Sequence, residues 1–310
     1  MKWDYGLDAH PSRATILHMK HPNRSLNIHK DLCLCGSGRL MRDCCLFVRC
    51  NTTPPSPIRG YAHPSCFARA LNNCDKIITG EHYISKSVLN IFQGTEATVS
   101  GMTWLPKNTQ KTVPIATLVG NMLCKRHNEA LSSLDALAAK FFGFYMAEWS
   151  NSNDDVDICL VRGFDLERWF LKMMCGLVAS GNATHKGKPF SSWTPPLSWL
   201  DILFGTADIV NPSGLHAVVG QFNVMSASFT ATVATKETTS EPIAIAFSTE
   251  GILFLLAMEA LPPKNSPGNT RTETFYRPMA VQLNRSHQVR EAHFGWPNGE
   301  VVSINMRSGK

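Results

Sequence analysis

The sequence predicts an α+β protein, because helical and strand-like patterns occupy different stretches of the chain. Apolar residues recur at three- and four-residue spacing in residues 129–144 and 164–180, which is typical of helices buried on one side. From residue 214 onward, apolar and polar residues alternate instead, as they do in half-buried strands. Closely spaced cysteines also occur at 32–50. We therefore expect a short cysteine-rich unit, a central unit, and a helix packed against an antiparallel sheet.

The length of 310 residues is enough for two or three domains with at least one sizeable hydrophobic core. Basic residues are concentrated early: residues 1–60 contain nine Lys and Arg against four Asp and Glu, whereas residues 151–310 contain 13 against 14. This distribution suits an anionic partner such as nucleic acid, although solubility alone explains it equally well.

Nothing in the first 31 residues resembles a signal segment, because this stretch is polar and rich in histidine. The longest apolar runs, residues 243–247 and 252–258, are too short to cross a bilayer. We therefore expect a soluble, cytoplasmic protein without membrane contact.

Two breaks divide the chain into units at 1–50, 61–149 and 156–310. Three prolines within residues 51–57 disfavour a helix and favour an extended linker over 51–60. The second break is a polar run at 150–155.

The last unit should contain one strong helix followed by strands. Its helix covers residues 164–180, with Asp165 as a plausible cap and Gly181 as a stop signal. The expected strands are 225–233, a hairpin formed by 243–247 and 252–258, and a final strand at 301–306. The sequence assigns no role to this unit.

The chain contains ten cysteines, and seven of them stand at spacings that suggest metal ligands. Without a signal segment, reduced thiols are expected rather than disulfides. Cys50, Cys159 and Cys175 have no such spacing, so we expect them to be structural thiols.

The first cysteine group is Cys33-Leu-Cys35-Gly-Ser-Gly, followed after eight intervening residues by Cys44 and Cys45. Four thiolates satisfy tetrahedral Zn²⁺, which would also stabilise a segment too small to fold alone. The pattern closely resembles the SEC-C motif, a small zinc-binding module, over residues 32–46. In relatives this module contacts partners or nucleic acid, so the resemblance implies an interaction role rather than catalysis.

The central unit contains Glu81-His82 and, further along, Cys124-x-x-His127-Asn128. Over residues 61–145 this arrangement resembles the HNH nucleases, which build a two-stranded hairpin and a helix around one divalent cation. The resemblance implies that Glu81 and His82 lie on the first strand and that Asn128 opens the helix expected at 129–144. It also implies hydrolysis of phosphodiester bonds, with DNA as the expected partner.

Phosphodiester hydrolysis needs a base to deprotonate water and a cation to stabilise the developing charge. His82 is the candidate base, because an imidazole is mostly neutral near pH 7. By resemblance, Glu81 and Asn128 are the candidate ligands for Mg²⁺ or Mn²⁺. Adjacent residues of a regular strand point to opposite faces, so Glu81 joins His82 only if the strand bends, which Gly80 permits. Asp135, two helical turns after Asn128, is either a supporting group behind the site or a capping partner.

A second zinc site is expected from Cys66, Cys74, Cys124 and His127, as in zinc-containing HNH proteins. The sequence departs from the usual pattern twice, because seven residues separate the first pair and a histidine stands where a fourth cysteine is more common. Four unrelated core residues are the alternative. If zinc is bound, it fixes the backbone next to Asn128.

The candidate phosphate contacts are Lys86, Lys125 and Arg126, which flank the motif residues; solvated surface positions are the alternative. Residues 90–120 form a long insertion between the two halves of the site, with Trp104, Lys107 and Lys111. This insertion either closes over DNA or packs on the scaffold, and the sequence does not choose.

Two functions are carried forward. The first is a metal-dependent HNH endonuclease with two structural zinc ions, by analogy a restriction or anti-phage defence enzyme. The second is a non-catalytic, zinc-dependent adaptor that binds nucleic acid or protein on the same scaffold. A zinc deaminase is disfavoured, because it needs His-x-Glu followed by Pro-Cys-x-x-Cys, whereas Glu81 precedes His82 and no Cys-x-x-Cys lies downstream.

Overall fold

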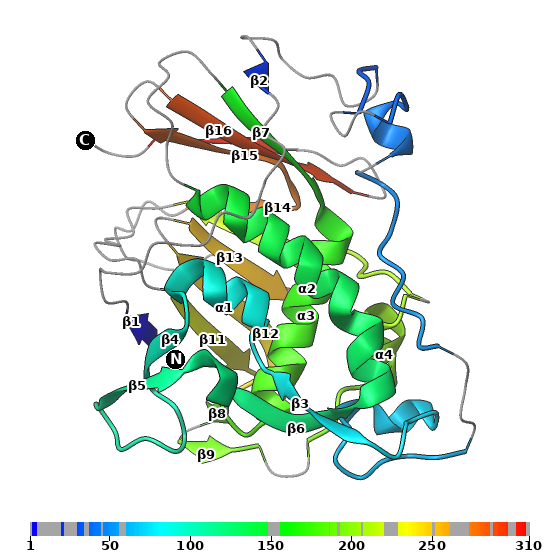
Figure 1. Ribbon diagram of the computed structural model, residues 1–310, viewed down its shortest axis with the longest axis vertical. Helices are drawn as coiled ribbons and strands as arrows, with labels where there is room; N and C mark the ends of the chain where they lie inside the picture. The colour runs from blue at the N-terminus through cyan, green and yellow to red at the C-terminus, as the bar shows by residue number, and fades with distance from the viewer. Residues whose placement is uncertain are drawn as a thin grey trace.

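The computed structural model describes residues 2–4, 20–21, 30–33, 37–44, 46–55, 60–147, 156–185, 187–190, 193–205, 207–219, 229–249, 252–260, 273–285, 288–296 and 302–307. Within these ranges the chain mixes helices and sheets, which confirms the α+β class (Figure 1).

Two long helices dominate the described residues. The α-helices there are α1 (Lys86–Gln93), α2 (Lys125–Met146), α3 (Gly163–Ala179) and α4 (Leu197–Leu203), with short 3-10 helices at Met41–Asp43, Phe67–Leu71 and Ile115–Thr117. The helix predicted at 129–144 begins four residues earlier, which brings Asn128 into its first turn. Asp165 does not cap α3: it lies in the first turn and accepts a hydrogen bond from the Cys50 backbone amide at 2.7 Å.

The strands form one large sheet and several smaller ones. Within the described residues the large sheet has eight strands in the order β14-β10-β13-β12-β11-β1-β4-β5, with antiparallel neighbours throughout. The strands are β1 (Lys2–Asp4), β4 (Glu96–Ser100), β5 (Gln110–Pro114), β10 (Gly214–Val219), β11 (Phe229–Thr235), β12 (Pro242–Thr249), β13 (Ile252–Ala257) and β14 (Glu273–Tyr276). The predicted hairpin is confirmed by the pairing of β12 with β13. The strand predicted at 225–233 coincides with β11 from Phe229 onward, and residues 225–228 lie outside the described residues.

A second sheet lies at the other end of the molecule (Figure 1). Its strand order is β17-β15-β16-β7-β2, formed by β2 (Lys20–His21), β7 (Val156–Arg162), β15 (Pro278–Arg285), β16 (Gln288–Gly295) and β17 (Val302–Arg307). The pairs β7–β16 and β15–β17 are parallel, so the expectation of a purely antiparallel sheet is wrong for this part. Strand β7 is far from β16 in the sequence, and such long connections permit parallel pairing.

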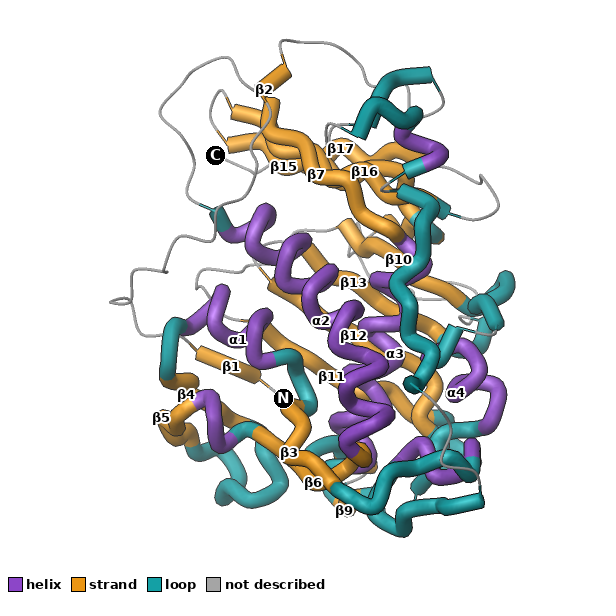
Figure 2. The backbone as a smooth tube through the Cα atoms, turned by 45° about the vertical axis from the view of Figure 1, so that its right-hand side comes forward, coloured by secondary structure: helices purple, strands orange, loops and turns teal. Residues whose placement is uncertain are grey.

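Helices α1, α2 and α3 lie side by side on one face of the large sheet (Figure 2). Aromatic rings fill the interface: Phe142 of α2 lies 5.1 Å from Phe247 of β12 and 5.5 Å from Trp169 of α3, measured between ring centroids. The units predicted at 61–149 and 156–310 therefore share one hydrophobic core. The boundary predicted at 150–155 lies outside the described residues and stays a prediction.

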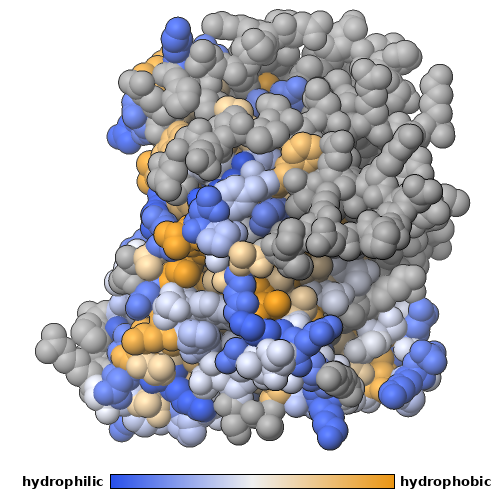
Figure 3. Space-filling model, turned by 180° about the vertical axis from the view of Figure 1, so that it is seen from behind, coloured by the Kyte–Doolittle hydropathy of each residue, from blue (hydrophilic) through white to orange (hydrophobic). Residues whose placement is uncertain are grey.

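Figure 3 shows the molecule from behind, where polar residues are interspersed with small apolar patches. Strand β11 illustrates the alternation that the sequence predicts: Phe229 and Ala231 are buried, whereas Thr232 and Ala234 are exposed.

Among the helices in the described part of the chain, none is long and apolar enough to cross a bilayer.

Helix α3 is buried on almost every side, although its apolar stripe predicts burial on one side. Its charged residues therefore lie in the interior with partners. Arg168 pairs with Asp165 at 2.8 Å, and Glu167 pairs with Arg277 at 2.9 Å. Lys172, the last of them, contacts the central unit.

The N-terminal cysteine segment forms a tight loop against β7. The Cys33 amide donates a hydrogen bond to the Arg39 carbonyl at 2.6 Å, and Gly38 has a φ of 70°, a conformation that glycine adopts readily. Met41 and Leu46 are buried and pack with Leu160 of β7. Cys35 and Cys45 lie outside the described residues, so the four-cysteine zinc site stays a prediction.

Candidate metal and catalytic centre

The central feature is a two-stranded hairpin followed directly by a helix. Strand β3 (Ile78–His82) pairs with β6 (Val119–Cys124) in antiparallel fashion, and α2 begins at the residue after Cys124 (Figure 1). The register shifts between Thr79 and Glu81, so the strand is irregular at Gly80. The bend that the sequence analysis requires at Gly80 is therefore present.

Four ligand atoms gather where this hairpin meets the helix. The sulfur atoms of Cys66, Cys74 and Cys124 and the ring of His127 are all buried, and their ligand atoms lie within 4.8 Å of one another. The His127 Nδ1 atom is 3.5, 3.8 and 3.1 Å from the three sulfur atoms, in that order. A tetrahedral zinc site has sulfur–nitrogen edges of about 3.6 Å, from its usual bond lengths. The cluster can therefore bind a metal ion such as zinc.

The residues around the cluster favour a bound cation. His127 Nε2 donates to the Asn73 side-chain oxygen at 2.8 Å, which leaves Nδ1 as the lone-pair nitrogen that faces the thiols. The Asp75 amide donates to the Cys124 sulfur at 3.3 Å. A hydrogen bond with Cys124 and burial raise the pKa of Cys66, whereas the hydrogen bond with Cys66 lowers the pKa of Cys124. Three crowded thiols therefore cannot all ionise unless a positive charge joins them.

The fold brings the first two ligands to the helix through a compact turn. Cys66 precedes the short helix Phe67–Leu71, and Asn72 then adopts a left-handed conformation that reverses the chain. The Cys74 amide donates to the Tyr61 carbonyl at 2.9 Å, which fixes the second ligand. The seven-residue spacing between the cysteines thus accommodates a helical turn.

Glu81 lies in the interior, with 8% of its surface exposed. Its Oε1 atom is 2.7 Å from the ammonium nitrogen of Lys172, which reaches over from α3. Burial raises the pKa of Glu81, and both Lys172 and a hydrogen bond with Asn128 oppose that rise. The sequence analysis did not anticipate this ion pair.

His82 is held by a backbone carbonyl. Its Nε2 atom is 3.2 Å from the oxygen of Ile115, and a carbonyl only accepts, so Nε2 carries the hydrogen. The other ring nitrogen, Nδ1, has no hydrogen-bond partner among the described residues. Burial lowers the pKa of His82, which favours the neutral ring. Ile115 belongs to the insertion 90–120, so part of that insertion packs on the scaffold and orients His82.

Asn128 contacts the Glu81 carboxylate, and Glu81 and His82 feel the same nearby charges. The Asn128 amide donates to the Thr79 hydroxyl at 3.0 Å and also hydrogen bonds with Glu81. The charges of Lys172 and Asp135 affect the pKa of Glu81 and of His82 alike. The same two charges therefore act on both neighbouring side chains.

Asp135 connects this region to the neighbouring helices. It lies 2.5 Å from the Lys172 ammonium and accepts a hydrogen bond from Ser85, the residue that precedes α1. Ser85 in turn accepts a hydrogen bond from the Trp169 indole at 2.7 Å. Asp135 thus accepts a hydrogen bond from the residue before α1 and also pairs with the lysine that binds Glu81.

Lys172 is the site residue that sequence reasoning missed. A signal exists: Asp165, Arg168 and Lys172 recur at helical spacing within an otherwise apolar helix, which is unusual for a buried face. The pattern does not reveal which residues pair with Lys172, because its partners are 37 and 91 positions earlier in the chain.

The three candidate phosphate contacts differ in exposure. Lys86 and Lys125 are exposed, and the Lys125 ammonium lies 3.9 Å from Glu129. Arg126 is 6% exposed and directs a guanidinium nitrogen toward the Pro54 carbonyl. A phosphate contact by Arg126 is therefore not supported by its position.

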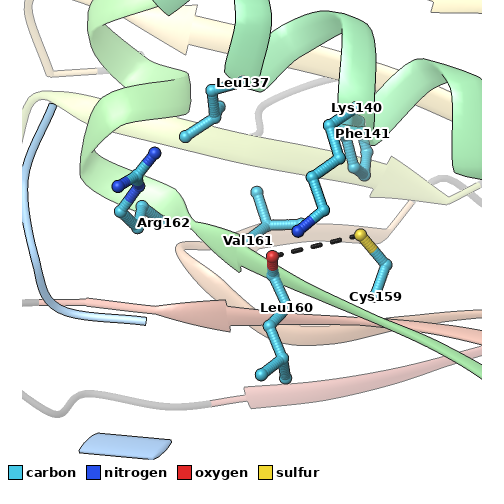
Figure 4. Close-up of a pocket in the computed structure, with 7 residues that line it drawn as sticks. All are labelled: Leu137, Lys140, Phe141, Cys159, Leu160, Val161 and Arg162. Atoms are coloured by element: carbon cyan, nitrogen blue, oxygen red, sulfur yellow. Dashed lines mark hydrogen bonds between the residues drawn. The ribbon is translucent and has the colours of Figure 1, made fainter. Parts of the chain in front are cut away.

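A small cavity of about 100 Å³ is lined by residues of α2 and β7 (Figure 4). It is lined by Leu137, Lys140, Phe141, Cys159, Leu160, Val161 and Arg162. Cys159 is buried, and burial raises its pKa to about 11, so it behaves as a core thiol as expected. The cavity has room for a few water molecules and carries no catalytic grouping.

Among the described residues, the Cys66–Cys74–Cys124–His127 cluster has its potential ligand atoms close enough together to hold a metal ion. Comparisons with protein-family models, curated proteins and solved structures find no match for the chain.

Proposed function

We propose that the chain is a metal-dependent HNH endonuclease that hydrolyses phosphodiester bonds of DNA. The observation that carries the proposal is the way in which His82 is held at the end of β3. Its Nε2 atom is tied to the Ile115 carbonyl, and Nδ1 has no partner among the described residues. Glu81, which directly precedes His82 in β3, hydrogen bonds with Asn128.

His82 acts as the general base in this proposal. The hydrogen bond to Ile115 fixes the tautomer, so that the lone pair lies on Nδ1 and can take a proton from water. Because burial lowers the pKa of His82, the ring is neutral and ready to accept that proton near neutral pH. The resulting hydroxide attacks phosphorus, and the bond to the leaving oxygen breaks.

Glu81 and Asn128 would hold Mg²⁺ or Mn²⁺, since both offer the oxygen ligands that these ions prefer. Such an ion stabilises negative charge on the phosphate and the leaving oxygen. The Cys66–Cys74–Cys124–His127 cluster would hold zinc one residue before Asn128. Zinc would then fix the start of α2 and so position Asn128.

The remaining parts of the proposal concern partners. Lys86 and Lys125 are exposed beside the centre and would contact DNA phosphates. The SEC-C segment would bind a second zinc ion and serve as a contact for protein or nucleic acid. A role in restriction or anti-phage defence rests on analogy alone.

One observation favours the second function, a zinc-dependent adaptor without catalysis. The Glu81 carboxylate is bound by the Lys172 ammonium at 2.7 Å, so one of its oxygens already has a cationic partner. A scaffold that has lost its catalytic cation would tolerate this arrangement. Such a protein would bind nucleic acid or protein and leave the nucleic acid intact.

Cleavage of supercoiled plasmid separates the two functions. The full-length, zinc-loaded protein should produce nicked or linear DNA with Mg²⁺ or Mn²⁺ and none with EDTA. Cleavage of single-stranded DNA and of RNA, measured in the same assay, shows which nucleic acid is the substrate. Binding of plasmid without any cleavage, at any concentration of either ion, would support the adaptor and end the nuclease proposal.

A further inference from the structure

Helix α3, which belongs to the unit without an assigned role, contributes a charged side chain to the proposed centre. Lys172 is 5% exposed, and its ammonium nitrogen lies 2.7 Å from Glu81 Oε1 and 2.5 Å from Asp135 Oδ2. The three residues come from α3, β3 and α2. The ammonium therefore joins three elements at the point where the candidate cation ligand Glu81 lies.

A purely structural role explains this arrangement poorly. Buried ion pairs seldom stabilise a fold more than apolar residues of the same volume, because both charges lose their hydration. The neighbours of Lys172 on α3, such as Leu171 and Met173, are apolar and well packed, so an apolar side chain would suit this interface. The positive charge of Lys172 is therefore better explained by the Glu81 and Asp135 carboxylates that it contacts.

We propose that Lys172 is a positioning residue for the nuclease centre: its ammonium holds one oxygen of Glu81 and keeps the divalent cation away from Asp135. This inference rests on the proposed function. Burial alone would lower the pKa of Lys172, but Asp135 and Glu81 outweigh burial and raise it, so the ammonium is charged.

The geometry gives Lys172 two effects. With Oε1 bound to Lys172, the other oxygen of Glu81 is the one left for a cation together with Asn128. The ammonium also reduces the combined charge of Glu81 and Asp135 from −2 to −1. Without it, two carboxylates would attract a divalent ion into the space between them, away from His82.

Asp135, one of the two carboxylates that bind Lys172, is held in place by hydrogen bonds to neighbouring elements. Asp135 is hydrogen bonded to Ser85, and Ser85 to Trp169 of α3, so α3 also contacts the residue that precedes α1. The proposed centre is therefore composite, with residues from both sides of the polar run at 150–155.

The test compares full-length, zinc-loaded Lys172→Met with the wild type in two measurements, Mn²⁺ binding by electron paramagnetic resonance and single-turnover plasmid cleavage. Mn²⁺ should bind at least about tenfold more tightly, because a positive charge near its ligands is gone. Cleavage should nevertheless fall about 100-fold, because the cation is misplaced, with little change in the DNA concentration for half-maximal rate. A merely structural role would not make binding tighter and cleavage slower together.

A second variant keeps the test decisive if Lys172→Met does not fold. Lys172→Met combined with Asp135→Asn restores the wild-type net charge of −1 and leaves no additional uncompensated carboxylate. It should bind Mn²⁺ within about threefold of the wild type, since net charge is unchanged, and still cleave about 100-fold more slowly. Lys236→Met, which removes an exposed lysine paired with Glu259, is the matched control and should behave as wild type.

The outcomes distinguish the two proposals. If the wild type cleaves DNA and the double variant cleaves equally well, Lys172 is not a positioning residue and the nuclease proposal stands. If folded Lys172→Met binds Mn²⁺ with wild-type affinity, Lys172 is likewise not a positioning residue, and the nuclease proposal again stands. If the wild type never cleaves, the nuclease proposal fails and this inference fails with it.

Discussion

Replacing His82 with alanine should lower the rate of DNA cleavage by about 10²–10⁴-fold, the usual contribution of a general base. The physical reason is that Nε2 of His82 is tied to the Ile115 carbonyl, which leaves Nδ1 as the proton acceptor of the proposed centre. The measurement is single-turnover cleavage of plasmid in Mn²⁺ by protein that retains its zinc. His82→Ala with wild-type activity would remove His82 as the base.

A second substitution separates proton transfer from structure at the same position. Glutamine at residue 82 can still donate a hydrogen bond toward the Ile115 carbonyl, but it cannot take a proton near neutral pH. His82→Gln should therefore fold as the wild type does and be as inactive as His82→Ala. His293→Ala is the matched control, because His293 pairs with Glu291 in the second sheet and should leave cleavage unchanged.

Cys124→Ser should remove one zinc ion per chain and destabilise the whole core. Structural zinc sites in small domains contribute about 10–16 kcal/mol, comparable to or larger than the total stability of a typical domain. Loss of one of four ligands should therefore leave a protein that unfolds many degrees lower or becomes insoluble. Zinc content by inductively coupled plasma mass spectrometry, followed by thermal unfolding, measures both effects.

Cys175→Ser provides the matched control for zinc content. Cys175 is fully buried in α3 and is not part of the Cys66–Cys74–Cys124–His127 cluster, so this variant should keep every zinc ion of the wild type. With the SEC-C site also occupied, we expect two zinc ions in the wild type and one in Cys124→Ser. Equal zinc content in the wild type and Cys124→Ser would contradict the assignment of this ligand.

The parts of the site that the sequence predicts are those in which side-chain type and spacing determine the position. Cys124 and His127 are three residues apart at the start of α2, and the structure confirms that they meet Cys66 and Cys74. The hairpin of β12 and β13 is predictable for the same reason, because two short apolar runs joined by a tight turn readily pair with each other.

Other features depend on contacts that leave no local pattern. The Ile115 carbonyl that holds His82 is a backbone group, so no residue type indicates it. Lys172 meets Glu81 only after α3 packs on α2, and the strand pairing that links β4 through β1 to β11 joins distant parts of the chain. The single hydrophobic core that the predicted units share therefore depends on the tertiary fold and could not be predicted from local sequence patterns.

The account rests on two metals with separate tasks, zinc for structure and Mg²⁺ or Mn²⁺ for hydrolysis. The most direct measurement is to pass the purified protein over a chelating resin that removes weakly held ions, count the zinc that remains, and follow plasmid cleavage as Mn²⁺ is added back. We predict that zinc stays bound, that cleavage is absent before Mn²⁺ is added, and that it returns in proportion to Mn²⁺ binding. Full cleavage with zinc alone, or none at any Mn²⁺ concentration, would contradict the account.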